Sequence, residues 1–177
     1  SARMGVSTAL ITFRKGGVGV LSCNPAMGGL GKGHLIREID AFGGLIAKAS
    51  DLSGIQFRIL NKTRGEAVQG PRAQIDRTKY KEGLSKLLRK EEINLICDEV
   101  MDVIVSKKKQ KIKVEGLRLK DSGKVICRSL VITTGTFLSG VIHQGDSSWP
   151  AGRLGAGPSS ELANFFKKYR FKLLRLK

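Results

Sequence analysis

The sequence is poor in cysteine, proline and aromatic residues, and the scarcity of each excludes a class of protein. Three cysteines, four prolines and 6% aromatic residues occur among 177 positions. The cysteines form no CxxC pair and no metal-ligand spacing, so we expect neither a disulfide scaffold nor a zinc site, and a reducing compartment fits best. No apolar run approaches the roughly 18 residues that a membrane-spanning helix needs, so such a helix is not expected.

Acidic residues are also scarce, and the resulting charge favours a polyanionic partner. The chain holds 32 lysines and arginines against 15 acids, a formal net charge of +17. Nucleic acid is the simplest partner for such a chain, although a basic surface can also serve solubility or reflect an organelle whose proteins are basic. Hydrophobic residues make up 41% of the sequence, which is enough for a folded core.

Glycine is abundant, yet the two familiar phosphate-binding motifs are absent. Nine of the 22 glycines lie between Gly16 and Gly44, where the backbone must bend sharply or approach a ligand closely. The Gly-Lys pair in this region does not complete a Walker A loop, because Ala26 and Gly33 occupy two of its required positions. The dinucleotide fingerprint G-x-G-x-x-G fails as well, since Ser22 stands where its third glycine belongs.

Hydrophobic periodicity predicts alternating strands and helices in the first half of the chain and mostly strands afterwards. Helices are expected at residues 32–49 (interrupted at Gly43-Gly44), 72–90 and 159–168. Strands are expected at residues 6–13, 55–60, 93–97, 100–105, 112–119 and 125–132, with loops at 15–31 and 61–71 and a solvated lysine tip at 107–111. Residues 2–5 are typical of a helix end, so we expect the chain to be a piece of a longer domain that enters in the middle of a βαβ unit.

This order predicts an α/β fold with a β-meander. It is also the order of a flavoprotein with two dinucleotide-binding domains, in which a β-ribbon is inserted before an apolar strand. That apolar strand is expected to end at residues 131–135. Periodicity alone does not establish the more specific architecture.

One loop has unusual chemistry. A thiol, Cys23, precedes Asn24 and Pro25, and the predicted helix begins a few residues later at Lys32. A helix N-terminus and a lysine both favour a thiolate, so Cys23 is a candidate reactive thiol. The alternative is a small residue packed in a tight turn, and the residues themselves leave both interpretations open.

Several long motifs resemble the MnmG (GidA) family, whose flavin enzymes build the carboxymethylaminomethyl-type group on the wobble uridine of tRNA. They lie at residues 23–35 (CNPAMGGLGKGHL), 38–44 (EIDAFGG), 54–61 (GIQFRILN), 72–77 (RAQIDR, with Tyr80), 133–138 (TTGTFL) and 150–155 (PAGRLG). At residues 73–76 (AQID) and 150–153 (PAGR) the sequence is more similar to mitochondrial members than to bacterial ones.

The resemblance implies that residues 1–177 form an incomplete Rossmann-like FAD-binding domain with inserted antiparallel strands at about 93–130. It implies FAD as cofactor, with reduced nicotinamide and methylenetetrahydrofolate as co-substrates. It also implies tRNA as substrate, an MnmE-like GTPase partner and a homodimer. The location would be the mitochondrial matrix, or the cytoplasm for a bacterial source.

The resemblance also implies roles for individual residues. Cys23 matches a catalytic cysteine, a thiol nucleophile or proton-transfer group at the uracil, and no metal ligand is implied. Residues 58–90 hold ten lysines and arginines against three acids, which suits contact with RNA phosphates. The nucleic-acid candidates are Arg72, Arg77, Lys79 and Lys81. The cofactor candidates are Val100, Thr134, Gly135, Ser159, Asn24, Gly28, Gly29, Lys32 and Arg153.

Two alternatives remain beside a partial flavoenzyme. The chain could be a non-catalytic basic RNA-binding module, or a non-functional fragment of the enzyme. The first glycine loop and the second catalytic cysteine of the family have no counterpart among these residues, so catalysis by this chain alone is not expected. Val100 could also belong to the core alone, and Gly135 to a turn alone.

Overall fold

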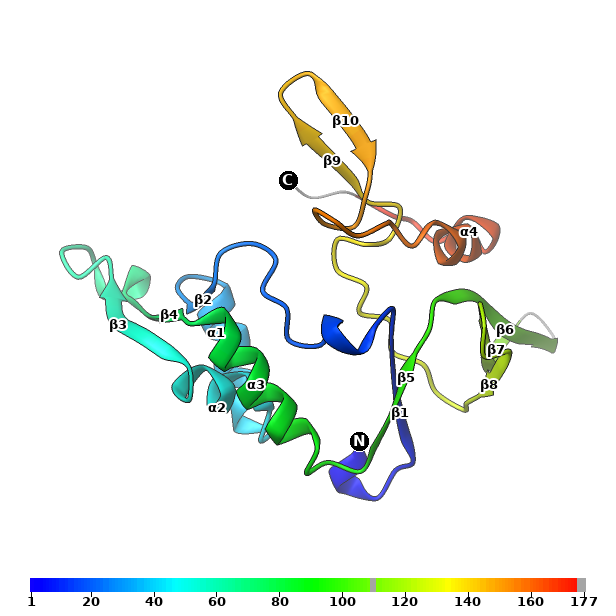
Figure 1. Ribbon diagram of the computed structural model, residues 1–177, viewed down its shortest axis with the longest axis horizontal. Coiled ribbons are helices and arrows are strands. Elements are labelled where there is room, and N and C mark those ends of the chain that lie inside the picture. The colour runs from blue at the N-terminus through cyan, green and yellow to red at the C-terminus, as the bar shows by residue number, and fades with distance from the viewer. Residues whose placement is uncertain (109–110, 175–177) are drawn as a thin grey trace. The chain divides into compact units, whose positions relative to one another are not determined.

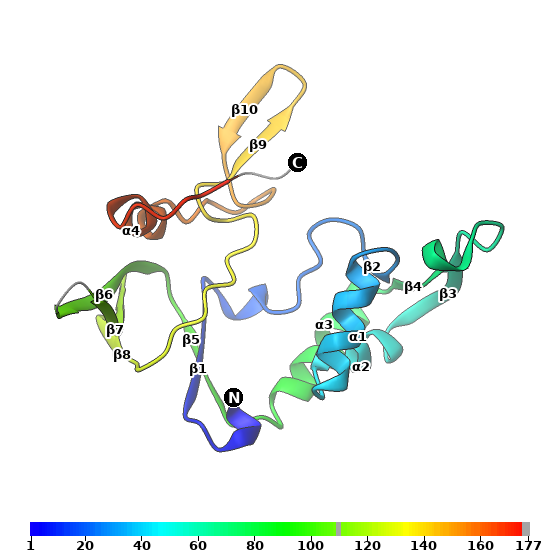
Figure 2. The same cartoon turned by 180° about the vertical axis from the view of Figure 1, so that it is seen from behind.

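The computed structural model describes residues 1–108 and 111–174, and the chain divides into two compact units (Figures 1 and 2). Unit 1 comprises Ser1–Leu10 and Arg14–Leu95, and unit 2 comprises Ile11–Phe13 and the chain from Ile96 onward. The boundary crosses β1 (Thr8–Thr12) and β5 (Ile93–Cys97), which pair with each other. Both strands were predicted, and each unit is described by itself below.

Unit 1 contains three packed helices, and the interruption between the first two, at Gly43-Gly44, was predicted. They are α1 (Lys32–Ala41), α2 (Leu45–Asp51) and α3 (Arg77–Leu88), and α2 contacts both α1 and α3. The chain turns between α1 and α2 at Gly43, whose φ is 74°. A Cβ on Gly44 would lie 2.7 Å from the carbonyl oxygen of Ile39, so no side chain fits there. Short 3-10 turns lie at Ala2–Met4, Lys15–Gly17 and Glu66–Val68.

The sheet of unit 1 corrects the predictions of two loops and one helix, since residues 26–28 and 70–71 were expected in loops and 72–75 in a helix. Its antiparallel order is β2 (Ala26–Gly28), β4 (Gly70–Ile75), β3 (Gly54–Leu60). The expected helix at residues 72–90 is wrong over its first residues, because Arg72–Ile75 belong to the central strand and Asp76 caps α3 by accepting from the amide of Lys79 at 2.8 Å. In β4 the buried Ala73 and Ile75 alternate with more exposed neighbours, which is the period of a strand.

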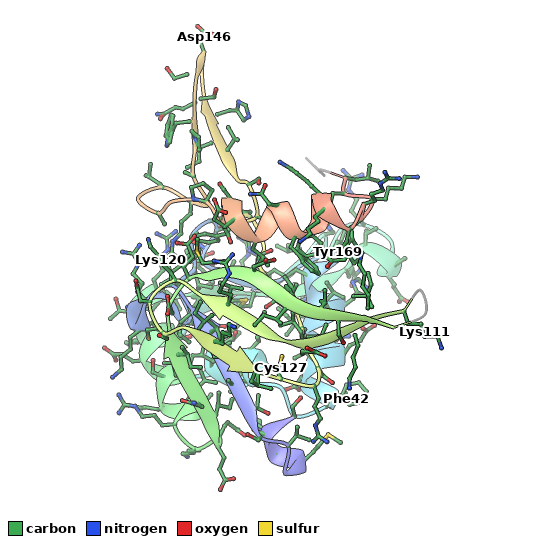
Figure 3. All side chains as sticks on the ribbon, turned by 90° about the vertical axis from the view of Figure 1, so that its right-hand side faces the viewer. Phe42, Lys111, Lys120, Cys127, Asp146 and Tyr169 are labelled. Carbon is green, nitrogen blue, oxygen red and sulfur yellow. The ribbon has the colours of Figure 1, made fainter. Side chains whose placement is uncertain are left out.

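Unit 2 is an antiparallel meander covered by one helix. β6 (Val100–Lys108), β7 (Lys111–Leu119) and β8 (Lys124–Ile126) pair in chain order, and α4 (Ser160–Lys168) packs on β6. Figure 3 shows α4 above this sheet, with Tyr169 at its end. The predicted strands at 100–105 and 112–119 and the predicted helix are confirmed. The centre of the expected lysine tip, residues 109–110, lies outside the described residues.

Two differences from expectation occur in unit 2. The strand expected at 125–132 ends at Ile126, and residues 131–135 form no strand. Leu130 and Ile132, which end the expected strand, instead pack against the core cluster of unit 2. The hairpin of β9 (Val141–Gln144) and β10 (Ser147–Pro150) was not predicted, and Asp146 lies at its tip (Figure 3).

Each unit has its own core. In unit 1 it consists of Met27, Ala49, Ala73, Ile75 and Tyr80. In unit 2 it consists of Val103, Leu117, Leu119, Leu162 and Phe165. Over residues 1–108 and 111–174, no helix is both long enough and apolar enough to span a bilayer.

Candidate functional site

The predicted catalytic thiol lies in an exposed turn of unit 1. This thiol turn, residues 22–25, leads directly into β2. Cys23 is a free, exposed cysteine, so the interpretation as a small packed residue does not hold. Its carbonyl oxygen accepts a hydrogen bond from Nη2 of Arg77 at 2.7 Å, and the carbonyl of Pro25 accepts from the amide of Ile75 at 2.7 Å. The turn is thus held to the junction of β4 and α3 while its thiol remains accessible to solvent.

The glycines after the thiol turn allow two strand backbones to pack closely, and this packing is independent of their expected role in cofactor binding. Gly28 has a φ of 114°, and a Cβ there would lie 2.1 Å from the carbonyl oxygen of Pro71. The amide of Gly29 donates to that same carbonyl at 2.9 Å. Close packing of two strand backbones therefore explains both positions, and their contact with a cofactor stays a prediction.

Lys32 and Asn24, two further cofactor candidates, make local contacts. The ammonium of Lys32 donates to the carbonyl oxygen of Ala26 at 2.7 Å, which ties the start of α1 to β2. Asn24 is exposed, and its carbonyl accepts from the amide of Ala26 at 2.8 Å. At the same helix start, the amide of Gly31 donates to Nδ1 of His34 at 3.2 Å. These contacts brace the loop around the thiol turn.

The four nucleic-acid candidates do not share one helix. Arg72 is in β4, half-buried, whereas Arg77, Lys79 and Lys81 lie in the first part of α3 and are exposed. Arg77 is held by the carbonyl of Cys23, so this arginine belongs to the thiol turn as much as to the basic surface. The contact joins residues 54 positions apart, and no local sequence signal could have indicated it.

In unit 2, four cofactor candidates gather around Phe137. The amide of Phe137 donates to the carbonyl of Thr134 at 3.1 Å, and the carbonyl of Phe137 accepts from the amide of Ser159 at 2.7 Å. The guanidinium of Arg153 lies 5.7 Å from the centre of the Phe137 ring. Thr134, Gly135, Arg153 and Ser159, from three segments, thus form one group that we name the Phe137 cluster.

The Phe137 cluster offers open backbone at Gly135. The φ of Gly135 is 57°, and no atom lies within 4 Å of the position that a Cβ would take. Ser159 is buried and occupies the N-cap position of α4, without a capping bond from its side chain. Val100, the remaining candidate, is half-buried and packs against the unit 2 core. Val100 thus packs on the unit 2 core, whereas the other four candidates of unit 2 lie in the Phe137 cluster.

Sequence reasoning missed a buried carboxylate, Asp98, which connects β5 to β6. Its oxygens accept from the amide of Glu99 at 2.6 Å and from the amides of Ser122 and Asp121 at 2.7 and 3.2 Å. A hydrogen bond from the side chain of Ser122, together with the smaller effect of these amide bonds, lowers the pKa of Asp98 to about 2. The acidic pair Asp98-Glu99 between two apolar strands was the available signal. No group of three or more His, Cys, Asp or Glu residues suited to a metal occurs in the described part of the chain.

Comparisons with known proteins agree with the resemblance. The family model for glucose inhibited division protein A matches residues 1–177. The tRNA uridine 5-carboxymethylaminomethyl modification enzyme MnmG of Sulfurihydrogenibium sp. (strain YO3AOP1) is 44% identical over the whole chain, and that of Zymomonas mobilis is 46% identical. The chain spans 28% of the length of each of these two relatives.

Solved structures show the same fold. The structure of Aquifex aeolicus GidA in its form II crystal superposes with a TM-score of 0.86 at 43% identity, over 98% of this chain and 28% of that one. The GidA-related protein of Thermus thermophilus, at 17% identity, shares the fold with a TM-score of 0.65. The predicted α/β class with antiparallel strands is confirmed. With its full length matched by the family model and its fold matched by a solved member, the chain belongs to the GidA family.

Proposed function

We propose that this chain is part of a flavin-dependent enzyme that modifies the wobble uridine of tRNA at ring carbon five. The group added would be of the carboxymethylaminomethyl or taurinomethyl type. The observation that carries the proposal is the exposed thiol of Cys23, in a turn whose carbonyl accepts from Arg77, in a chain 44% identical to a named uridine-modifying enzyme. Because the chain spans 28% of that relative, the activity is proposed for the whole protein.

In this proposal Cys23 acts on the uracil ring as a nucleophile or a proton-transfer group. A catalytic thiol must be reachable by the base, and Cys23 is exposed. The thiol must also be positioned. The hydrogen bond from Arg77 to the carbonyl oxygen of Cys23 fixes the backbone that carries the thiol. The bonds from Ile75 and Lys32 hold the neighbouring residues of the same loop.

The residues present fit FAD as cofactor. The Phe137 cluster combines open glycine backbone, a serine at a helix start and an arginine, which are groups that approach and bind phosphate or ribitol oxygens. Val100, Thr134, Gly135, Ser159 and Arg153 would hold it in unit 2, with Asn24, Gly28, Gly29 and Lys32 as the candidates of unit 1. When bound, FAD supplies two-electron redox chemistry. Reduced nicotinamide and methylenetetrahydrofolate are proposed as electron and one-carbon donors.

The proposed partners are tRNA, an MnmE-like GTPase and a second copy of the protein. The net charge of +17 supports contact with a polyanion such as tRNA. For location we propose the mitochondrial matrix, which the sequence of residues 73–76 and 150–153 supports, or the cytoplasm of a bacterium. Residues 1–177 are proposed to belong to one cofactor-binding domain, with the strands at about 93–130 as its inserted part.

Flavin binding tests the cofactor assignment. Gly135→Leu should weaken FAD binding at least tenfold, because its side chain would enter open space at the Phe137 cluster. Gly145→Leu is the matched control, since Gly145 has a φ of 56° and equal space at the hairpin tip. Equal loss of FAD binding in the two variants, measured by quenching of flavin fluorescence, would refute the assignment.

Uridine modification tests the thiol. Cys23→Ser in the whole protein should abolish modification while FAD stays bound, because a serine hydroxyl cannot replace a thiolate. Cys97→Ser, also at an exposed cysteine, is the control and should remain active. Nucleoside analysis of the tRNA by mass spectrometry measures both, and a fully active Cys23→Ser variant would remove Cys23 from the mechanism.

A further inference from the structure

The turn at residues 134–140 joins two other segments of unit 2 through hydrogen bonds. The hydroxyl of Thr136 donates to the carbonyl oxygen of Gly152 at 2.7 Å. The carbonyl oxygen of Phe137 accepts from the amide of Ser159, also at 2.7 Å. One turn therefore fixes both the segment around Gly152 and the start of α4, two places that supply cofactor candidates.

The side chain of Phe137 packs against backbone that only glycine permits. A Cβ on Gly152 would lie 2.1 Å from Cδ1 of the Phe137 ring, so the ring contacts the bare backbone of that residue. A second ring, that of Phe13, has its centre 5.4 Å from the centre of the Phe137 ring, at an interplanar angle of 38°. Phe13 directly follows β1 and belongs to unit 2. Tertiary contacts therefore hold the Phe137 ring in one place.

The guanidinium of Arg153 lies over this ring. Its central carbon is 5.7 Å from the ring centre, within the roughly 6 Å over which an aromatic face attracts a cation. An aromatic face attracts a guanidinium without neutralising its charge, whereas a carboxylate would neutralise it. The contact with Phe137 therefore fixes the position of a cation and does not cancel its charge.

The residues next to this contact are also suited to an anion. Gly135 is exposed, and no atom lies within 4 Å of the position that a Cβ would take. Ser159 is the N-cap residue of α4. Open glycine backbone allows a ligand to approach closely, and a helix start favours negative charge. Arg153 is thus held beside backbone that an anionic group can reach.

We propose that Phe137 is a positioning residue for cofactor binding, and that its aromatic face holds the Arg153 guanidinium where the guanidinium binds phosphate. This assignment deepens the proposed function and rests on it for the identity of the phosphates, which would be the pyrophosphate of FAD. Phe137 acts through Arg153, so its own contact with the cofactor is not required. The aromatic face is the essential property, which a tyrosine retains and a leucine lacks.

Flavin binding to the whole protein, measured by fluorescence quenching, tests the ring. Phe137→Leu should weaken FAD binding roughly fivefold, the value for one lost cation–ring contact, whereas Phe137→Tyr should bind as the wild type does. Both variants keep the backbone groups of residue 137, so the comparison isolates the ring.

The control is Phe166→Leu, which should leave FAD affinity unchanged. Phe166 is a half-buried ring of the same unit, and it packs against Phe165 and the unit 2 core. Equal affinities of Phe137→Leu and Phe166→Leu would overturn the proposal. A Phe137→Tyr variant as weak as Phe137→Leu would also overturn it, because the aromatic face would then have no effect.

A double-mutant cycle tests whether the ring acts through Arg153. Arg153→Ala alone should weaken FAD binding more than Phe137→Leu does, because it removes the cation itself. In the Arg153→Ala background, Phe137→Leu should add less than about a twofold loss, since no guanidinium remains for the ring to hold. A full fivefold further loss would show that the ring acts independently of the arginine and would refute the positioning role.

Failure of this inference can be separated from failure of the proposed function. The contact between Phe137 and Arg153 forms without flavin, so the same cycle applies to the urea midpoint of Trp149 fluorescence, a signal from unit 2. A midpoint shift for Phe137→Leu that shrinks in the Arg153→Ala background supports the contact, and additive shifts refute it. A protein that binds no FAD would sink the proposed cofactor, and the midpoints would then decide the positioning of Arg153. Normal FAD binding with additive shifts would sink this inference alone.

Discussion

The two units hold their candidate residues in different ways. In unit 1 the thiol turn is fixed by hydrogen bonds to backbone carbonyls, those of Cys23, Pro25 and Ala26, and by glycine packing at Gly28. In unit 2 four candidates are connected to Phe137 through backbone hydrogen bonds and a cation–ring contact, and Val100 packs against a core of large side chains. Substitution of Arg77 can therefore loosen the thiol turn with little loss of stability, whereas substitution of Gly28 or of a unit 2 core residue is expected to reduce stability.

The cores reinforce this difference. Two of the five buried residues in the unit 1 core are alanines, whereas the unit 2 core is built from leucines, a valine and a phenylalanine. Unit 1 also leaves more apolar surface exposed, including a stripe of Leu35, Ile39 and Phe42 along α1. Less buried apolar area gives less hydrophobic stabilisation, so we expect unit 1 to open more easily than unit 2.

The largest effect is expected at the centre of the unit 2 core. Phe165→Ala should reduce the free energy of unfolding by about 3–5 kcal/mol, because a buried ring is replaced by a cavity. The single tryptophan, Trp149, lies in unit 2, so its fluorescence in a urea titration reports on this unit. Phe42→Ala, at a position 91% exposed, should change the free energy of unfolding by less than about 0.5 kcal/mol. Equal costs would contradict the assignment of the core.

A smaller loss is expected where unit 1 depends on glycine. Gly28→Ala should cost about 2–3 kcal/mol, since it combines a positive φ with a Cβ placed against the carbonyl of Pro71. Gly31 has a φ of 73° with open space around it, so Gly31→Ala should reduce the free energy of unfolding by about 1 kcal/mol. This variant measures the cost of the positive φ without a steric clash. Urea titration followed by the helical circular dichroism signal measures both, and a Gly28→Ala as stable as Gly31→Ala would show that β2 and β4 do not pack closely.

Local sequence patterns predicted the elements whose neighbours lie close in the chain. The break at Gly43-Gly44, the strands β1, β3, β5, β6 and β7, and the helix α4 all follow from periodicity and glycine placement. The central strand β4 was missed because its short alternation runs directly into the cap of α3 at Asp76, so one apolar stripe appeared to continue. The hairpin β9–β10 did have a signal, a Gly145-Asp146 pair between two β-prone runs.

Local sequence patterns did not predict the contacts that form the candidate site. The thiol was singled out from its loop and from the family resemblance, but its exposure and its link to Arg77 depend on a strand pairing between segments nearly fifty residues apart. The hydrogen bonds of Asp98 likewise join residues more than 20 positions apart. Contacts of this kind arise from tertiary packing, and periodicity carries no information about them.

The pH dependence of unit 2 should sharpen the comparison further. Because the folded pKa of Asp98 is about 2, below its ordinary value of 3.8, its stabilising effect is complete above about pH 4 and is lost as the pH falls through 2. Asp98→Asn should lower the urea midpoint of Trp149 fluorescence at neutral pH and flatten its dependence between about pH 4 and 2. Asp146→Asn, exposed at the hairpin tip, is the control and should leave that dependence unchanged. An unchanged dependence in Asp98→Asn would disprove the role of this carboxylate.

The smallest effect concerns the thiol turn itself. Arg77→Gln removes the hydrogen bond to the carbonyl of Cys23, a net contribution of about 1 kcal/mol that fixes the turn locally. Amide hydrogen exchange of residues 22–24 should therefore accelerate about fivefold, while the free energy of unfolding changes little. Lys79→Gln removes the same charge from a nearby position in the first turn of α3 and should leave that exchange unchanged. Equal acceleration in both variants would assign the effect to charge, and Arg77 would then belong with the basic surface and not with the thiol.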